Sequence, residues 1–533
     1  MALPGLMIAG SLLALAIGLF YQLAIQPTGN SLTLGPRFFK TLGWTTLQAT
    51  LSALLSVTLG VALAWALSHQ SSFAGRKIYI ALLSSALVLP TLVVVLGLVT
   101  VLGRSGWLNS GLQVAQLQTI DPFIYGLGGI LIAHCYFNIS FAARSILHRF
   151  ESIPAEQLKL AQSLGLNSWQ RFKLIELPAV SSSLATLTTT IFLLCFTSFA
   201  IVLTLGGTPK YNTLEVSIYE AIKLDFDLGR ALGLALAQLA ICGVLVIVSA
   251  GFRNNTILIS GNQHRRPVNQ NRLLTKGIQW TIIIVFGVFF LLPLLAVMID
   301  GITADFSALL GQKTFQMALI TSVLIALVST GIVLVSSIAL AIAYTTLAIE
   351  QRLGGFKLSR ITLRLLSFSS TLYLAVPSLV LGIGFFLLAR NIGGDYKLWA
   401  IVALLTANTI MVLPFAIAIF APAMVKSANR YDKLAASLGL RGWHRWRVIE
   451  SALLQRELIY IACLAFCMSL GDLGVIALFG SNDIATLPWL LYQKMGSYRT
   501  QEAAGVALVM LMLTLIVFLA VPKILGRENA TAR

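Results

Sequence analysis

Charged residues are scarce in this sequence. Only 11% of its 533 residues are charged and 57% are hydrophobic, whereas a soluble globular protein carries about 25% charged residues. This scarcity excludes an ordinary soluble protein and predicts an all-α integral membrane protein. We expect twelve apolar spans, because about 20 residues are needed to cross a bilayer. Their centres lie near Leu15, Leu55, Leu89, Ala133, Phe192, Leu239, Phe289, Val333, Val380, Ile410, Phe466 and Leu513.

The groups that catalysis needs are also missing. The dipeptide Gly-Lys does not occur, so the sequence has no phosphate-binding loop of the G-x-x-x-x-G-K-[ST] type. If ATP drives this protein, another polypeptide binds it. The five cysteines all lie in apolar runs and are expected to pack there, since no pair is spaced like a metal site. No nucleophile stands beside a base, so we expect no enzyme activity, no cofactor and no metal.

Basic residues are absent from the start of the chain, where the first Lys or Arg is Arg37. A signal peptide would begin with a basic segment, so the first apolar run is expected to be a retained helix. Most of the 37 Lys and Arg fall on one side of the predicted spans. The positive-inside rule then places both termini in the cytoplasm. The net charge of +18 thus indicates membrane topology and anionic lipid rather than nucleic acid.

The sequence repeats itself at an offset of 274 residues. EQLKLAQSLGLNSWQRFKLIELP (156–178) resembles RYDKLAASLGLRGWHRWRVIESA (430–452), and TLEVSIYEAI (213–222) resembles TLPWLLYQKM (486–495). Six spans per repeat return the chain to its starting side, so the two repeats are expected to be parallel. We predict a first repeat at 1–252, a basic cytoplasmic linker at 253–278 and a second repeat at 279–533.

The two polar segments, the first loop (156–178) and the second loop (430–452), both face the cytoplasm in this topology. Each is expected to contain a short amphipathic helix, with Leu158, Ala161 and Gly165 on one face of the first. In the second, Leu434, Leu438 and Gly439 are expected to form the equivalent face. Small residues on this face would let another surface approach closely. An ordinary solvated loop explains the basic charge but not the pattern A-x-S-L-G-L-x-x-W-x-R-x-x-x-I-E in both copies. If the loops contain two docking helices for a partner with two equivalent binding sites, both the charge and the repeated pattern are explained.

The first loop resembles the cytoplasmic loop of ABC-importer permeases, through E-x-x-x-x-A-x-x-x-G followed by I-E-L-P. The resemblance implies the type I ABC importer permease fold, in which this loop forms a coupling helix that enters a cleft of the ATPase subunit. Arg430 and Ala452 depart from the pattern in the second loop. The residues that match, and that would therefore couple to the ATPase, are Glu156, Ala161, Gly165, Pro178, Ala435 and Gly439.

Two permease repeats fused in one chain resemble the arrangement in the ferric-iron and thiamine import systems. YGLGGILIAHCYFNISFAARSIL (125–147) and SLGDLGVIALFGSNDIATLP (469–488) resemble the bacterial thiamine-import permeases, as does nearly the whole chain. This implies an inner-membrane subunit that moves thiamine, and its phosphate esters, from periplasm to cytoplasm. The implied partners are an ATP-binding subunit, expected in two copies, and a periplasmic thiamine-binding protein.

Polar residues inside the spans are candidates for the substrate path. Asp472 is the clearest intramembrane acid, and burying an acid in a bilayer is costly unless it serves a purpose. Asp472 could face a cationic ring, or it could hydrogen-bond a neighbouring helix or mark a break at Gly471 and Gly474. The other candidates could instead form interhelical hydrogen bonds. They are His134, Tyr136, Asn138 and Asn408, the last at the 274-residue equivalent of His134.

Two alternatives stay open at this point. A ferric-iron importer shares the fused layout, but naked iron needs hard oxygen ligands and the spans offer essentially one carboxylate. A secondary transporter with parallel repeats would use ion-coupling acids in its spans and would need no partner for its loops. A channel is less favoured, because no segment resembles a selectivity filter.

Overall fold

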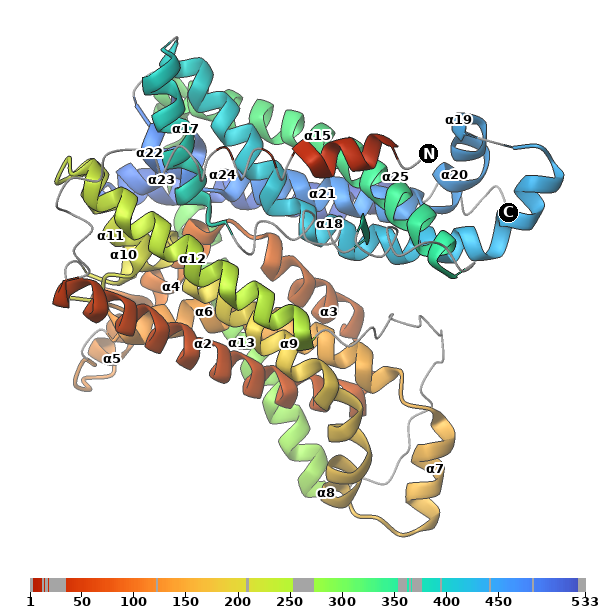
Figure 1. The fold of residues 1–533 in the computed structure, drawn as a ribbon. Coiled ribbons are helices and arrows are strands. Elements are labelled where there is room, and N and C mark those ends of the chain that lie inside the picture. Colours follow the sequence, from red (N-terminus) through yellow and green to blue (C-terminus); the bar gives the residue numbers. More distant parts are fainter. Residues whose placement is uncertain are drawn as a thin grey trace. The chain divides into compact units, whose positions relative to one another are not determined.

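The computed structural model is helical throughout the part of the chain that it describes (Figure 1). These helices divide into two compact units. The first unit holds Leu34–Val216 and Val244–Thr303, and the second holds Met1–Thr33, Ser217–Gly243 and Ala304–Arg533. The described residues are 3–11, 14, 18, 35–120, 123–207, 210–252, 273–352, 362–363, 366, 376–393, 395–440, 442–481 and 484–525.

The first unit is built around long apolar helices, with the first loop at one end. Pro36 at the start of α2 and Pro178 at the start of α9 occupy positions where a missing backbone N–H costs nothing. Its helices are α2 (Pro36–His69), α3 (Arg76–Ser85), η2 (Ala86–Val88), α4 (Thr91–Leu102), α5 (Trp107–Val114), α6 (Leu127–Glu151), α7 (Ala155–Ser163), α8 (Ser168–Arg171), η3 (Phe172–Glu176), α9 (Leu177–Phe196), α10 (Ala200–Leu205) and α13 (Leu273–Ile302).

The second unit contains the second loop and two of the longest helices. The boundaries between the units fall within α11 (Leu214–Lys223) and α12 (Leu228–Phe252). The remaining helices of the second unit are α14 (Phe306–Gly311), α15 (Lys313–Arg352), α17 (Ser378–Ile392), α18 (Tyr396–Ser437), α19 (Gly442–Arg445), η5 (Trp446–Glu450), α20 (Ser451–Leu453), α21 (Gln455–Gly471), α22 (Gly474–Phe479), α23 (Leu487–Gly496), α24 (Thr500–Leu515), η6 (Ile516–Ala520) and α25 (Val521–Leu525).

The membrane class predicted from composition is confirmed. Among the described residues, nine helices are long and apolar enough to cross a bilayer, and a bent pair, Ser168–Ser181 with Ser183–Phe196, raises this to ten. The run around Val380 forms the shorter apolar helix Ser378–Ile392. Most of the run around Leu15, and the predicted linker up to residue 272, lie outside the described residues. The number twelve therefore stays a prediction.

The two sequence halves exchange their first helices. In the first unit, α13 from the second half packs against α2 and α4. Gly97 makes this crossing possible, because a Cβ there would lie 2.3 Å from the Pro293 carbonyl oxygen. In the second unit, Gly5 from the first half lies against the backbone of Ala339 in the same manner, since its Cβ would lie 2.2 Å from that carbonyl oxygen. Close helix contacts of this kind need small residues. The predicted repeat boundaries thus do not coincide with the compact units.

Candidate coupling site

The first loop starts where a proline separates two helices. Helix α6 ends at Glu151, Pro154 occupies the N-cap position, and α7 begins at Ala155. Proline has no N–H to continue the helix and disfavours helical geometry in the residue before it. The first loop therefore contains a separate nine-residue helix, as its sequence predicts.

The second loop is supported differently. Helix α18 runs for 42 residues from Tyr396 to Ser437 and enters the loop without a break. The residue equivalent to Pro154 is Ala428, which is buried inside α18. The expectation of a separate short helix is therefore wrong for the second loop, because no proline interrupts the chain at this position.

Both loop helices end in the same glycine motif. Gly165 and Gly439 have φ values of +68° and +64°, the left-handed region that favours glycine. In each case the N–H of the glycine and the N–H of the next residue bond back to carbonyls of the last helical turn, which is a Schellman motif. The bonds are Gly165 to Gln162 (3.0 Å), Leu166 to Ala161 (3.0 Å), Gly439 to Ala436 (3.2 Å) and Leu440 to Ala435 (2.9 Å).

This motif corrects the expected position of Gly165 on the helix face. Helix α7 ends at Ser163, so Gly165 does not share a helix face with Leu158 and Ala161. No atom lies within 4 Å of the place where a Cβ would stand on either Gly165 or Gly439. The left-handed backbone conformation by itself requires glycine at these two positions, and close approach of a partner surface there stays a prediction.

Each loop also carries an arginine and a glutamate five residues apart, which a π-helical turn brings together. Arg171 Nε lies 3.3 Å from Glu176 Oε1, and Arg445 Nε lies 2.6 Å from Glu450 Oε1. The glutamates end the π-helical segments η3 and η5. In an α-helix these residues would point in different directions, whereas a π-turn has a repeat that aligns them. The pairing repeats at the 274-residue offset.

The third member of the ion cluster differs between the loops. In the first loop it is His69, the last residue of α2, whose Nε2 contacts Arg171 and lies 3.3 Å from Glu176 Oε1. In the second loop it is Asp432 of α18, 2.6 Å from Arg445 Nη2. The first cluster ties the loop to a distant helix, whereas the second ties it to the helix that leads into the loop.

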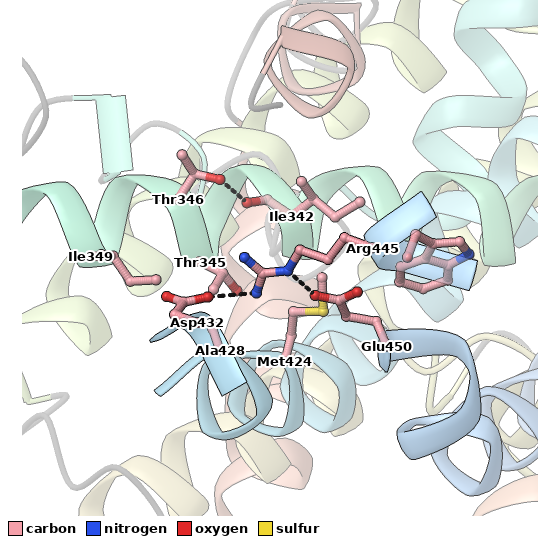
Figure 2. Close-up of a pocket in the computed structure, with 10 residues that line it drawn as sticks. Ile342, Thr345, Thr346, Ile349, Met424, Ala428, Asp432, Arg445 and Glu450 are labelled. Carbon is pink, nitrogen blue, oxygen red and sulfur yellow. Dashed lines mark hydrogen bonds and ion pairs between the residues drawn. The ribbon is translucent and has the colours of Figure 1, made fainter. Parts of the chain in front are cut away.

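Figure 2 shows the guanidinium of Arg445 between the Asp432 and Glu450 carboxylates. Burial acts to lower the pKa of Arg445, but the hydrogen bonds to Glu450 and Asp432 raise it above its ordinary value, so the group stays charged. The cavity around these side chains measures about 230 Å³ and is lined by α15, α18 and the second loop. A groove of about 630 Å³ lies beside α7 in the first unit.

Large apolar side chains are exposed at matching positions of the two loops. Leu160, Leu164 and Leu174 are 60%, 67% and 60% exposed in the first loop. Their equivalents at the 274-residue offset are 51%, 63% and 59% exposed, and these are Leu434, Leu438 and Val448. We call these two sets the first and second apolar patches. Exposed apolar patches with a polar rim mark interaction surfaces.

The sequence interpretation missed the first patch, whereas it named Leu434 and Leu438 of the second. In the first loop it placed the docking face on Leu158 and Ala161, which are 1% and 2% exposed and therefore pack inside the protein. Ala435 is likewise 1% exposed, whereas Glu156 and Pro178 lie at the surface. The sequence did contain a signal for the first patch. Leu160 and Leu164 are four residues apart, and the same spacing recurs at Leu434 and Leu438 in the second loop.

Four of the substrate-path candidates form hydrogen bonds in the core. His134 Nδ1 lies 2.9 Å from Ser52 Oγ, and the Tyr136 hydroxyl donates to the Phe290 carbonyl at 3.0 Å. The structure thus places these side chains in interhelical contacts, as the alternative interpretation expected. The other two bonds run from Asn138 Nδ2 to Cys195 Sγ (3.3 Å) and from Asn408 Nδ2 to Ser469 Oγ (2.7 Å).

Asp472 lies in the break between α21 and α22. Its Oδ1 accepts the N–H of Gly474 at 3.1 Å, so it caps the start of α22. Its Oδ2 is buried and has no hydrogen-bond partner among the described residues. Asp472 therefore marks a helix break, as one interpretation expected, and still presents an acceptor that a ligand could use.

Comparison with known proteins places these features in a family. Residues 56–255 match the family described as the binding-protein-dependent transport system inner membrane component. The chain is 39% identical to a thiamine transport system permease protein of Escherichia coli, over 87% of this chain and 85% of that protein. The chain belongs to the thiamine transport permease family of binding-protein-dependent ABC transporters. The expected family and fold class are thereby confirmed.

The chain is also similar to two further relatives. A thiamine transport system permease protein of Brucella abortus is 36% identical over 95% of this chain and 92% of its own length. A ferric transport system permease protein of Actinobacillus pleuropneumoniae is 25% identical over 85% of this chain and 66% of that protein. Membership of a binding-protein-dependent permease family favours a transport subunit over an ion-coupled secondary transporter.

Proposed function

We propose that this chain is the permease subunit of an ATP-driven importer in the bacterial inner membrane, with both termini in the cytoplasm. It moves thiamine and its phosphate esters from the periplasm to the cytoplasm, as the names of its relatives suggest. A periplasmic binding protein delivers the substrate, and two copies of a separate subunit hydrolyse ATP. Each sequence repeat, 1–252 and 279–533, supplies one docking loop.

The observation that carries this proposal is the pair of equivalent apolar patches. Each patch exposes three large apolar side chains on a cytoplasmic loop, which costs solvation free energy unless a partner covers them. Because the patches match position by position, their partners present equivalent sockets, as two copies of one subunit do. The sequence lacks a phosphate-binding loop, so ATP hydrolysis by that partner completes the transport cycle.

The ion clusters carry motion from the loops into the spans. When the first patch moves, Glu176 and Arg171 move with the start of α9 and with His69 at the end of α2. In the second loop Arg445 couples the start of the next span to α18. Buried ion pairs transmit such displacement because separating their charges in a low-dielectric setting is costly. Closing the two ATPase copies would then open the transport path outward.

The first test is ATP hydrolysis and substrate uptake in proteoliposomes that contain the complex of this chain with its ATP-binding subunit. We expect binding protein loaded with thiamine to stimulate both. Stimulation by binding protein loaded with ferric iron alone would keep the architecture and overturn the substrate. Uptake by this chain without the ATP-binding subunit would contradict the proposal altogether.

Asp472 is the residue that we propose to meet the cationic ring of the substrate. The variant Asp472→Asn keeps a capping oxygen for the Gly474 N–H and removes the negative charge. We expect the KM for thiamine uptake to rise about tenfold, since one charge contact is lost. An unchanged KM would restrict Asp472 to its capping role.

A further inference from the structure

The cavity between α15, α18 and the second loop has more carboxylates than cations among its lining side chains. All of its lining residues belong to the second unit. The charged ones are Asp432 and Glu450, with Arg445 between them (Figure 2). Two carboxylates and one guanidinium give this lining one unbalanced negative charge. A charge beside an apolar cavity is costly unless a counter-charge accompanies it, so the lining favours a cation.

Two buried oxygen atoms at this cavity have no hydrogen-bond partner in the part of the chain that the structure describes. They are Glu450 Oε2 and Thr345 Oγ1, on residues that are 4% and 5% exposed. The next residue of α15, Thr346, lines the same cavity, but its hydroxyl donates to the Ile342 carbonyl at 2.8 Å. Buried polar atoms are normally paired, because an unpaired one loses its solvation without compensation. The two oxygens therefore indicate a ligand that carries positive charge.

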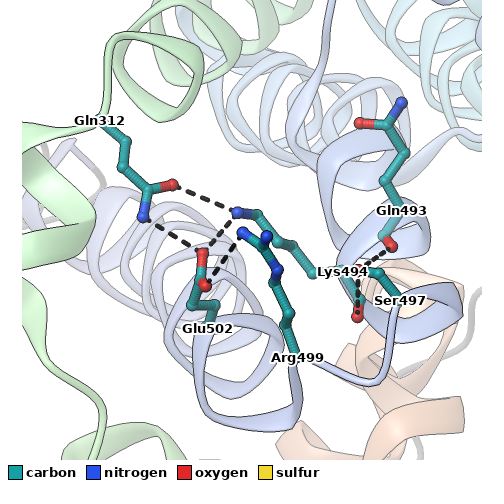
Figure 3. A network of polar contacts seen from close by, with 6 residues as sticks. All are labelled: Gln312, Gln493, Lys494, Ser497, Arg499 and Glu502. Atoms are coloured by element: carbon teal, nitrogen blue, oxygen red, sulfur yellow. Dashed lines mark hydrogen bonds and ion pairs between the residues drawn. The ribbon is translucent and has the colours of Figure 1, made fainter.

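A second polar network of the same unit pairs its carboxylate fully within the protein. Figure 3 shows Glu502, whose Oε2 contacts Lys494 and accepts a hydrogen bond from Gln312 Nε2 at 3.2 Å. Its other oxygen, Oε1, lies 3.5 Å from Arg499 Nη1. Glu450, in contrast, bonds through Oε1 alone among the described residues. The unpaired oxygen of Glu450 is thus a property of this cavity and not of ion clusters in this unit generally.

The rest of the cavity suits the apolar part of an organic cation. Its walls include the side chains of Ile342, Ile349 and Met424 and the aromatic ring of Trp446, and aromatic rings attract organic cations. The volume of about 230 Å³ is below the roughly 300–1,000 Å³ of pockets for drug-sized ligands. It fits a small ammonium group or one cationic ring. A metal ion would need several oxygen ligands instead of apolar walls.

We propose that this cavity is a binding site for a small organic cation. Glu450 Oε2 supplies the counter-charge, Thr345 Oγ1 accepts a hydrogen bond, and the apolar walls cover the rest of the ligand. A cation held there joins α15 to the second loop. Two sources carry this chemistry, namely a free cation such as the cationic ring of thiamine and the ammonium headgroup of a lipid. The site goes beyond the proposed function, and only its position on the cytoplasmic side rests on that function.

Choline and its uncharged analogue 3,3-dimethyl-1-butanol are the probes that test the charge. Thermal unfolding of the full chain in detergent, at increasing probe concentration, gives the apparent Kd of each. The chain carries Asp472→Asn, so that the carboxylate proposed to meet the substrate does not contribute. We expect choline to bind at least about tenfold more tightly than the analogue, because only choline pairs with a carboxylate. Equal binding of the two probes, or no binding of choline, would overturn the site.

Variants of the lining assign the binding to this cavity. Glu450→Gln should weaken choline binding about tenfold or more, because it removes the counter-charge. Glu502→Gln is the matched control, since it removes a carboxylate of the same unit that is already paired. If the control weakens binding as much as Glu450→Gln does, the site is overturned.

The two neighbouring threonines give a test that does not disturb the ion pairs. Thr345→Val should weaken choline binding about two- to tenfold, because one hydrogen bond to the ligand is lost. It should not lower the unfolding temperature without ligand, since the hydroxyl has no partner among the described residues. Thr346→Val is the control, because that hydroxyl bonds to its own helix. Equal effects of the two variants on choline binding would contradict the proposal.

Competition identifies the source of the cation. The chain is placed in phosphatidylglycerol nanodiscs, and either thiamine is added to the solution or phosphatidylethanolamine to the lipid. Displacement of choline by thiamine supports the site and assigns it to a free cation, whereas displacement by phosphatidylethanolamine supports it and assigns it to a headgroup. If the complex imports thiamine but choline binding ignores Glu450, the site is wrong and the function stands. If choline binding depends on Glu450 but thiamine is not imported, the site stands and the proposed substrate is wrong.

Discussion

The two loops have matching outer surfaces but different internal supports. Both end their helices in a Schellman motif, both place an Arg–Glu pair on a π-turn, and both expose three apolar side chains. The first loop, however, has a separate helix after Pro154 and is tied to His69, whereas the second extends α18 and is tied to Asp432. Among the matching features, the three exposed apolar side chains are those that a partner would touch.

This difference indicates which properties the protein must keep. An interior support can be built from a proline break or from a continuous helix, provided that the same surface results. A surface that meets two copies of one partner has no such freedom. The following predictions test this contrast, from the largest expected effect to the smallest.

Arg171→Ala should have the largest effect on stability. It leaves the fully buried Glu176 without its arginine, and breaking a buried ion pair costs about 3–5 kcal/mol. Arg445→Ala should cost less, because the Arg445 side chain is 21% exposed and Asp432 37%, although it too leaves a buried glutamate, Glu450, without its arginine. Thermal unfolding of the purified variants in detergent measures both. The double variant R171M/E176Q should recover most of the loss, and equal losses at Arg171 and Arg445 would contradict the difference in burial.

Adding a proline to the second loop should reduce stability far more than removing the proline from the first loop. Ala428→Pro places proline inside α18 and should cost about 3 kcal/mol. Pro154→Ala removes a helix break at an exposed position and should change stability by less than about 1 kcal/mol. Thermal unfolding again provides the measurement. A tolerated Ala428→Pro would mean that the second loop does not depend on the continuity of α18.

Charges placed on the apolar patches should release the ATP-binding subunit. Leu164→Asp and Leu438→Asp each remove an apolar contact worth about 2 kcal/mol when buried by a partner. We expect the doubly substituted chain to reach the membrane and to lose the subunit on purification. Gln162→Asp with Ala436→Asp is the matched control, because these residues are exposed on the opposite side of the same helices. Equal losses in both double variants would indicate a general effect of charge.

The glycines should show the smallest and most graded effect. Gly165→Ala forces an alanine to a φ of +68° and should cost about 1 kcal/mol of stability. Gly165→Asn should cost less, because asparagine enters the left-handed region more readily. The same order is expected at Gly439. The measurement is thermal unfolding, and an order that follows side-chain size instead would favour a contact surface at these glycines.

The membrane fold could be predicted because runs of about 20 apolar residues have few other uses. The exchange of first helices between the two sequence halves could not be predicted. It depends on how α13 crosses α2 and α4 at Gly97, and not on the local hydrophobic pattern of the sequence. Likewise, the run around Leu89 became a helix from Thr91, because Pro90 precedes it.

The two repeated loops could be located from sequence, but the arrangement of their side chains could not. The repeated loops could be located from their charge and their shared pattern. Which leucines point outward could not be decided, because Leu158 and Leu160 are both apolar and only tertiary packing buries the first. The Arg171–Glu176 pairing was hidden by its spacing, since residues five apart do not meet on an α-helix and a π-turn is not evident from sequence.

The most direct test of the account is the number of ATP-binding subunits that the chain carries, measured by native mass spectrometry of the purified complex. Two equivalent patches predict two copies per chain. A complex with a single copy, or a chain that binds none, would contradict the claim that both loops are docking sites.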